Sequence, residues 1–149
     1  MAKSSTDSII ETVEKWYSAV PSLPKNFQEV LVKLAPWVAL IFGILGLLAG
    51  IAGLGIMATL SPLAALGGVG GVRAAGSGIL AAVLLIASSG LMLAAFPGLK
   101  SGKMNGWNMM FWSEVVTLVS SVLAISISGV VFDLVGFYLL FQIKRYYKA

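Results

Sequence analysis

Residues 36–60 read PWVALIFGILGLLAGIAGLGIMATL, a run of 25 residues without a charged side chain. At about 1.5 Å of rise per residue, a helix of this length exceeds a hydrocarbon core roughly 30 Å thick. Its glycines recur at steps of three, four and three residues, at Gly43, Gly46, Gly50 and Gly53. These steps place all four on one helical face, over which a second helix can approach closely. The stretch predicts a membrane-spanning helix that packs through glycine.

The composition of the whole chain agrees with a membrane environment. Of its 149 residues, 58% are hydrophobic and 11% are charged, whereas soluble domains are nearer 45 to 50% apolar. The chain has no His and no Cys, which removes the usual ligands of zinc, copper, haem and iron–sulfur centres and the residues most enzymes use as base or thiol nucleophile. We therefore expect a non-enzymatic membrane protein without a cofactor or a metal site.

Three more apolar stretches follow the first, and the sequence predicts an all-α protein with four transmembrane helices. We place the spans at about 36–60, 79–96, 107–126 and 130–143, which form a domain over 36–149. Pro97 and Gly98 are expected to end the second span, and Ser128 and Gly129 to reverse the chain before the fourth. Residues 61–78 include six glycines, which argues against a regular helix and leaves a loop or a re-entrant segment.

Residues 1–35 predict an amphipathic region at the membrane surface. Ser8 and Glu11 fit a capping box for a first helix, and Pro21 and Pro24 would end it. Its apolar residues recur at helical spacing, as Ile9, Ile10, Val13, Trp16, Tyr17 and Val20. Asn26 is expected to cap a second short helix, with Phe27, Val30, Leu31 and Leu34 on one face. The region either only anchors the bundle at the interface or supplies a helix that binds a partner.

The positive charges predict the topology. Of the ten Lys and Arg residues, only Arg73 falls on the side opposite the termini. The positive-inside rule then places both termini and the turn between spans two and three in the cytoplasm of a multi-pass protein of the inner (plasma) membrane. The net charge of +4 is thus explained by topology and by contact with the lipid bilayer, and nucleic-acid binding is not expected.

Two ionisable residues, Glu114 and Asp133, lie inside the predicted spans. A charge in hydrocarbon is costly, so each should face protein or water and have a partner. Counting helix rise from the predicted span ends puts the two carboxyls at opposite depths, roughly 12 to 15 Å apart. Asp133 is therefore expected to pair with Arg73 at the outer rim.

Glu114 has hydroxyl residues beside it on the same predicted helix, namely Ser113, Thr117, Ser120 and Ser121. This polar side predicts either an interhelical hydrogen-bond seam or one wall of a water-filled path. The methionines at 104, 109 and 110 are interpreted as packing residues near the interface and not as a soft-metal site.

Several segments carry a likeness to known sequences: GWNMMFWSEVVTLVS at 106–120, AFPGLK at 95–100, GFYLLFQIK at 136–144 and LAPWVALIFGILG at 34–46. Together they resemble small four-span membrane proteins of candidate-phyla bacteria. The resemblance implies a bacterial envelope protein without an established activity. Some of those proteins carry a chromate-transporter label, but this chain is short for that family and lacks its duplicated half.

Two functional hypotheses follow. The first is a structural or interaction protein that packs through small-residue helix faces, as a homo-oligomer or as a subunit bound to a membrane partner protein. The second is a small channel or transporter for an ion or small solute, in which Glu114 lines the path.

Overall fold

The computed structural model describes residues 4–148, and over these residues the chain folds into helices. They are α1 (Ser5–Tyr17), α2 (Lys25–Leu66), α3 (Gly68–Lys100), α4 (Met104–Leu123), α5 (Ile127–Ile143) and the short 3-10 helix η1 (Lys144–Tyr146). Three helical segments are long and apolar enough to cross a membrane, namely α2, α3 and α5 with η1. The prediction of an all-helical chain is confirmed, and the count of four spans stays a prediction.

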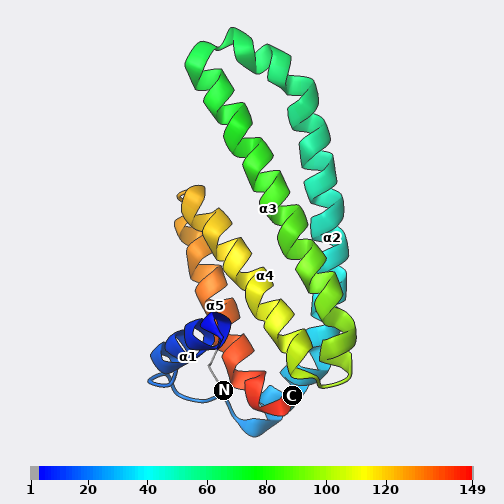
Figure 1. The fold of residues 1–149 in the computed structure, drawn as a ribbon, viewed down its shortest axis with the longest axis vertical. Helices are drawn as coiled ribbons and strands as arrows, with labels where there is room; N and C mark the ends of the chain where they lie inside the picture. Colours follow the sequence, from blue (N-terminus) through cyan, green and yellow to red (C-terminus); the bar gives the residue numbers. More distant parts are fainter. Residues whose placement is uncertain (1–3, 149) are drawn as a thin grey trace.

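The helices form two antiparallel hairpins of different length (Figure 1). The α2–α3 hairpin is the longer one and extends beyond the α4–α5 hairpin at the end opposite the termini (Figure 1). With 42 residues in α2 and 20 in α4, the two helices are about 63 Å and about 30 Å long. The described chain begins and ends at the same end of the bundle, where α1 packs beside α5 (Figure 1).

The glycine face of α2 lies against α3. A Cβ added at Gly50 would come within 2.5 Å of the Ile86 side chain and 3.2 Å of the Ala82 carbonyl. At Gly46 the added atom would meet the Ser89 hydroxyl at 2.2 Å. Only a hydrogen side chain allows the two helices to approach this closely. The face expected to associate with other helices is therefore covered by the chain's own α3.

The expectation of a loop at residues 61–78 is wrong. Helix α2 continues to Leu66 and α3 starts at Gly68, so the reversal occupies Gly67 and the left-handed Gly68, whose φ is +63°. At Gly71 an added Cβ would lie 1.9 Å from the Ala64 carbonyl. The glycines therefore allow a tight helical turn, and helix satisfies their backbone groups where an apolar environment supplies no water.

Prolines also proved weaker as helix ends than expected. Pro36 and Pro62 lie inside α2, which starts at Lys25 without a separate short helix before it, and Asn26 is not its cap. Pro97 lies inside α3, which ends only at Lys100. A proline removes one helical hydrogen bond, and in these long, packed helices that loss does not end the helix.

The ends of α4 and α5 also differ from the predicted ones. Each helix begins three residues earlier than the predicted span, α4 at Met104 and α5 at Ile127. The chain reverses between them at residues 124–126, where Ile125 has a φ of 54°, and not at Ser128 and Gly129. These shifts alter the depth of both acidic residues.

Helix α1 begins one turn earlier than expected. Ser4, not Ser8, is its N-cap, and Ser4 and Asp7 form the capping box. The Tyr17 hydroxyl at its other end donates to the Leu134 carbonyl at 2.9 Å, and its ring stacks on Phe141 with centroids 5.6 Å apart. Ile10 is buried, whereas Trp16 is exposed. Helix α1 is thus fastened along the side of α5.

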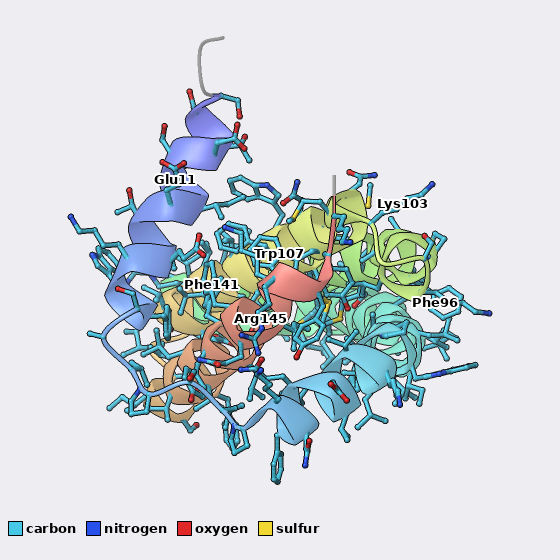
Figure 2. The ribbon with its side chains drawn as sticks, turned by 90° about the horizontal axis from the view of Figure 1, so that it is seen from below. Glu11, Phe96, Lys103, Trp107, Phe141 and Arg145 are labelled. Atoms are coloured by element: carbon cyan, nitrogen blue, oxygen red, sulfur yellow. The ribbon has the colours of Figure 1, made fainter. Side chains whose placement is uncertain are left out.

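An aromatic cluster forms the core between α4 and α5. Trp107 and Phe111 are fully buried, and Phe111 meets Phe137 edge to face with centroids 5.5 Å apart. The Trp107 indole N–H donates to the Leu140 carbonyl at 2.9 Å. Viewed from the end that carries the termini, Trp107 and Phe141 lie near the middle of the bundle (Figure 2). This cluster fixes how α4 and α5 are rotated toward each other.

The C-terminal segment closes that end of the bundle. Met104 N–H donates to the Lys148 carbonyl at 2.7 Å, and Lys148 N–H donates to the Gly102 carbonyl at 2.9 Å. The α3–α4 turn is held by a backbone contact in which a Cβ at Gly106 would lie 2.4 Å from the Gly98 carbonyl carbon. The two hairpins are therefore joined at their common base.

The α2–α3 contact predicts opposite effects of one substitution at two glycines of α2. Gly50→Ala should lower the free energy of unfolding by about 1 to 3 kcal/mol, because the methyl group enters a filled contact. Gly55, with nothing near its Cβ position, is the matched control, and Gly55→Ala should raise stability by up to about 1 kcal/mol through helix propensity. Unfolding of both variants in detergent measures the difference. Equal effects would contradict the contact.

Tyr147 allows a second test, because its buried hydroxyl has no hydrogen-bond partner. Removing an unsatisfied buried hydroxyl should not destabilise the fold, so Tyr147→Phe is expected to raise the free energy of unfolding by up to about 1 kcal/mol. Tyr138→Phe, which loses a bond of 2.7 Å to the Pro21 carbonyl, should lower it by about as much. Denaturation in detergent measures both.

The buried hydroxyl of Tyr147 also predicts how the stability of the protein changes at high pH. Burial raises the pKa of Tyr147 to about 12, so the folded state holds this proton where the unfolded state has lost it. Stability should fall as pH rises from about 10, the ordinary pKa of tyrosine, through about 12. An ultraviolet titration should show a tyrosine ionising near pH 12 that Tyr147→Phe removes. Unchanged curves would contradict the burial.

Candidate functional site

Glu114 lies in the middle of α4 and packs directly on α5. A Cβ built at Gly136 would be 1.9 Å from Glu114 Oε1, so the carboxyl occupies the space that any larger residue at 136 would fill. Within residues 4–148, no hydrogen bond and no ion pair involves this carboxyl. A glycine on the facing helix thus makes room for a carboxyl group that the described residues leave without a partner.

Asp133 lies near Glu114, which corrects the expectation that the two sit at opposite depths. Glu114 is about 13 Å and Asp133 about 9 Å from the turn end of the α4–α5 hairpin, counted along each helix. Their charges are close enough to repel each other. The expectation was wrong because α4 ends at Leu123, three residues before its predicted end, and α5 starts at Ile127, three residues before its predicted start.

The expected ion pair between Arg73 and Asp133 is absent from the part of the chain that the structure describes. Arg73 is exposed in the first turns of α3, and this part of the hairpin lies beyond the end of the α4–α5 hairpin (Figure 1). Asp133 is buried, and its Oδ2 has no hydrogen-bond partner. The greater length of the α2–α3 hairpin is what separates the two residues.

Tyr17 brings α1 to the same place. Its hydroxyl bonds the carbonyl of Leu134, the residue after Asp133. Burial, and after it the negative charge of Glu114, raises the pKa of Tyr17 above its ordinary value. The phenol therefore stays protonated as a donor beside the two acids, and α1 covers this side of the site.

On its other side Glu114 lines a cavity of about 280 Å³ between α2, α3, α4 and α5, here called the Glu114 cavity. Its α2 wall is a helical stripe of Leu31, Leu34, Ala35 and Val38, and its α5 wall is a second stripe that starts at Gly136. Both stripes have the steps of three and four residues that put side chains on one helix face. Glu114 is the only polar residue among those that line the cavity.

The hydroxyl residues expected beside Glu114 do not join it. Ser113 is fully buried and donates to the Ser88 carbonyl of α3 at 2.9 Å, and Thr117 donates to the Ser113 carbonyl of its own helix at 3.0 Å. Ser121 packs toward Gly129. Neither these residues nor Ser120 line the cavity. Ser113 thus belongs to a hydrogen-bonded seam between α3 and α4, separate from the carboxyl.

Some residues of the cavity were missed by the sequence analysis. Gly136 makes room for Glu114. Its position one helical turn after Asp133, in an apolar stretch, was the sequence signal that could have identified it. Met110 precedes Glu114 by four residues and shares its face, and Met92 comes from α3. No local pattern pointed to Met92, because its place in the cavity depends on how α3 packs.

The chemistry open to this site is that of a single carboxyl in apolar surroundings. It can hold a proton or a positively charged group. Among the described residues, no group of three or more His, Cys, Asp or Glu side chains is placed to hold a metal ion. A scan against protein-family models, and searches of curated proteins and of solved structures, each found no match to this chain.

Glu114 and Asp133 lie close together and repel each other. A double-mutant cycle at these two residues should therefore give a coupling energy opposite in sign to that of a salt bridge. At alkaline pH, Glu114→Gln and Asp133→Asn should each raise the free energy of unfolding by about 1 kcal/mol, because each removes a poorly compensated charge and the repulsion. The double variant should gain about 0.5 to 1 kcal/mol less than the sum, since the repulsion is removed only once.

The control for this cycle pairs Asp133→Asn with Arg73→Gln. These two changes should add, because the residues do not touch. Unfolding in detergent measures both cycles. Coupling between Arg73 and Asp133, together with strict additivity for the two acids, would contradict this placement of Glu114, Asp133 and Arg73.

Proposed function

We propose that this chain is a multi-pass membrane protein that moves a small cation, a proton included, with Glu114 as the group that holds it. The observation that carries the proposal is the Glu114 carboxyl, which opens on an interhelical cavity and has no partner within residues 4–148. Ionisable residues inside membrane helices are costly, and most of those that persist serve substrate, ion or proton pathways.

The neighbours of Glu114 support this reading. Asp133 repels its charge, so a proton or another cation on either carboxyl relieves the repulsion. No cationic side chain among the described residues lines the cavity. A carboxyl that only stabilised the fold would gain most from a fixed Lys or Arg partner.

We also propose four spans with both termini in the cytoplasm of the inner membrane. Helix α4 is 20 residues long, which suffices for a hydrocarbon core of about 30 Å. It runs between α3 and α5 in antiparallel order, and both ends of the chain lie at one end of the bundle (Figure 1). Among the described residues, the Lys and Arg side chains other than Arg73 belong to the segments at that end, as the positive-inside rule requires.

A structural or interaction role is the second candidate, and the unequal hairpins favour it. The part of α2–α3 beyond α4–α5 exposes large apolar side chains, among them Leu63, Leu66, Val69 and Val72. A helix longer than the local hydrocarbon thickness must tilt, deform the bilayer or find a partner. In this reading the protein associates with a copy or a membrane partner through these residues, since its glycine face is already covered.

Ion and proton flux into liposomes distinguishes the two candidates. The parent protein should conduct, and Glu114→Gln at matched incorporation should reduce the rate at least about tenfold, because the amide cannot take up or neutralise a cation. Glu29→Gln removes an exposed carboxyl outside the cavity and is the control. An absence of flux across protons and a broad set of cations and anions would contradict transport and favour the interaction role.

A further inference from the structure

We propose that the Glu114 cavity binds an amphiphilic organic cation, with an ammonium-type head against the Glu114 carboxylate and an apolar body among the surrounding side chains. This inference rests on the proposed function and names the ligand class. It follows from the pairing of one negative group with walls that are otherwise entirely apolar.

The positive charge of the ligand is inferred from the uncompensated negative charge of the Glu114 carboxylate. The carboxyl packs against Gly136, faces the cavity and meets repulsion from Asp133. A positive ligand head would supply the compensation that the described residues do not. In a site shielded from water such a pair is stronger than at an exposed surface.

The apolar body of the ligand is inferred from the side chains that line the Glu114 cavity. Apart from Glu114, the lining residues are Leu, Ile, Val, Ala, Met and Gly, which offer no hydrogen bond from a side chain. Met92 and Met110 face the cavity from α3 and α4, and their unbranched thioether side chains adapt to ligands of different shape. A cavity of about 280 Å³ is near the lower end of small-molecule sites, so the body should be small.

The same lining disfavours inorganic cations. Calcium requires six to eight oxygen ligands and magnesium six in octahedral geometry, whereas the side chains around the cavity offer the oxygens of one carboxylate. A small hydrated ion would lose water here without replacement, since the rest of the wall is carbon and sulfur. An ammonium that carries its own apolar groups has no such loss.

The cavity also reaches the outer surface of the helices. Leu34 and Val38 line it and are at the same time exposed, 49% and 39% respectively. In a bilayer these two residues would face acyl chains. An amphiphilic cation that has partitioned into the membrane therefore enters from the side, past Leu34 and Val38, without crossing water.

Calorimetric titration of the purified protein in detergent tests the proposal with benzyltrimethylammonium as the probe. We expect saturable binding that Glu114→Gln weakens at least tenfold, whereas Glu114→Asp retains part of it and Glu29→Gln leaves it unchanged. Neopentylbenzene, the neutral isostere, and tetramethylammonium, which lacks the aromatic body, should both bind much more weakly. Thermal unfolding of each variant establishes that it is folded.

A second pair of variants tests the cavity without changing the acid. Val38→Trp should block the mouth of the cavity and weaken benzyltrimethylammonium binding. Ile41→Trp is the matched control, because Ile41 is exposed on the same helix but does not line the cavity. Equal binding by these two variants would overturn the assignment of the ligand to this cavity.

The remaining outcomes separate this inference from the proposed function. No binding, or binding that Glu114→Gln does not affect, overturns the ligand class. If proton flux in liposomes still depends on Glu114, the proposed function survives with a proton as its cation. Equal binding of neopentylbenzene would identify an apolar lipid site and overturn the role of charge. If binding and flux both fail, both proposals fall.

Discussion

The close contact between α2 and α3 is the constraint on which the rest of the structure depends. Gly46 and Gly50 let the two backbones approach until a single added methyl group would collide with α3. In an apolar solvent, helices gain little from burying one aliphatic side chain against another, so such tight packing over small residues is a main source of association. The contact extends a hairpin well beyond the other two helices (Figure 1) and supplies the wall against which α4 packs.

The position of the acidic site depends on how the α4–α5 hairpin packs against the α2–α3 hairpin. The buried aromatic cluster around Trp107 and Phe111 fixes the rotation of α4 against α5, and the Ser113 bond to Ser88 fixes α4 against α3. With these faces occupied, Glu114 is directed at Gly136 and at the space between α2 and α5. Helix α1, held through Tyr17, covers the other side. A carboxyl in this position is surrounded by packed helices, yet none of the described contacts neutralises it.

Much of the fold and part of the site were predictable from local sequence patterns, and the predictions that were wrong failed for physical reasons. The helical class, the glycine face of α2 and the two acidic residues within apolar stretches were all visible in the sequence. The loop at residues 61–78 was wrong because glycine disfavours helix through exposed backbone and chain entropy in water, whereas packed apolar helices satisfy the backbone internally. The pairing of Asp133 with Arg73 was wrong because the longer α2–α3 hairpin carries Arg73 beyond the end of the α4–α5 hairpin (Figure 1). The depths of Asp133 and Glu114 were wrong because α4 ends, and α5 starts, three residues earlier than predicted.

The sequence by itself determined the apolar character and the all-helical class of the chain, because hydrophobic content and helical spacing are local properties that any stretch of chain carries with it. It also determined that Glu114 and Asp133 would be the unusual groups, since a charge within an apolar helix is exceptional wherever that helix packs. Only the tertiary structure decided which groups surround them. Whether Glu114 meets a cation, a hydroxyl or an empty cavity depends on the rotation and depth of four helices relative to one another, and those follow from packing contacts between residues far apart in the chain.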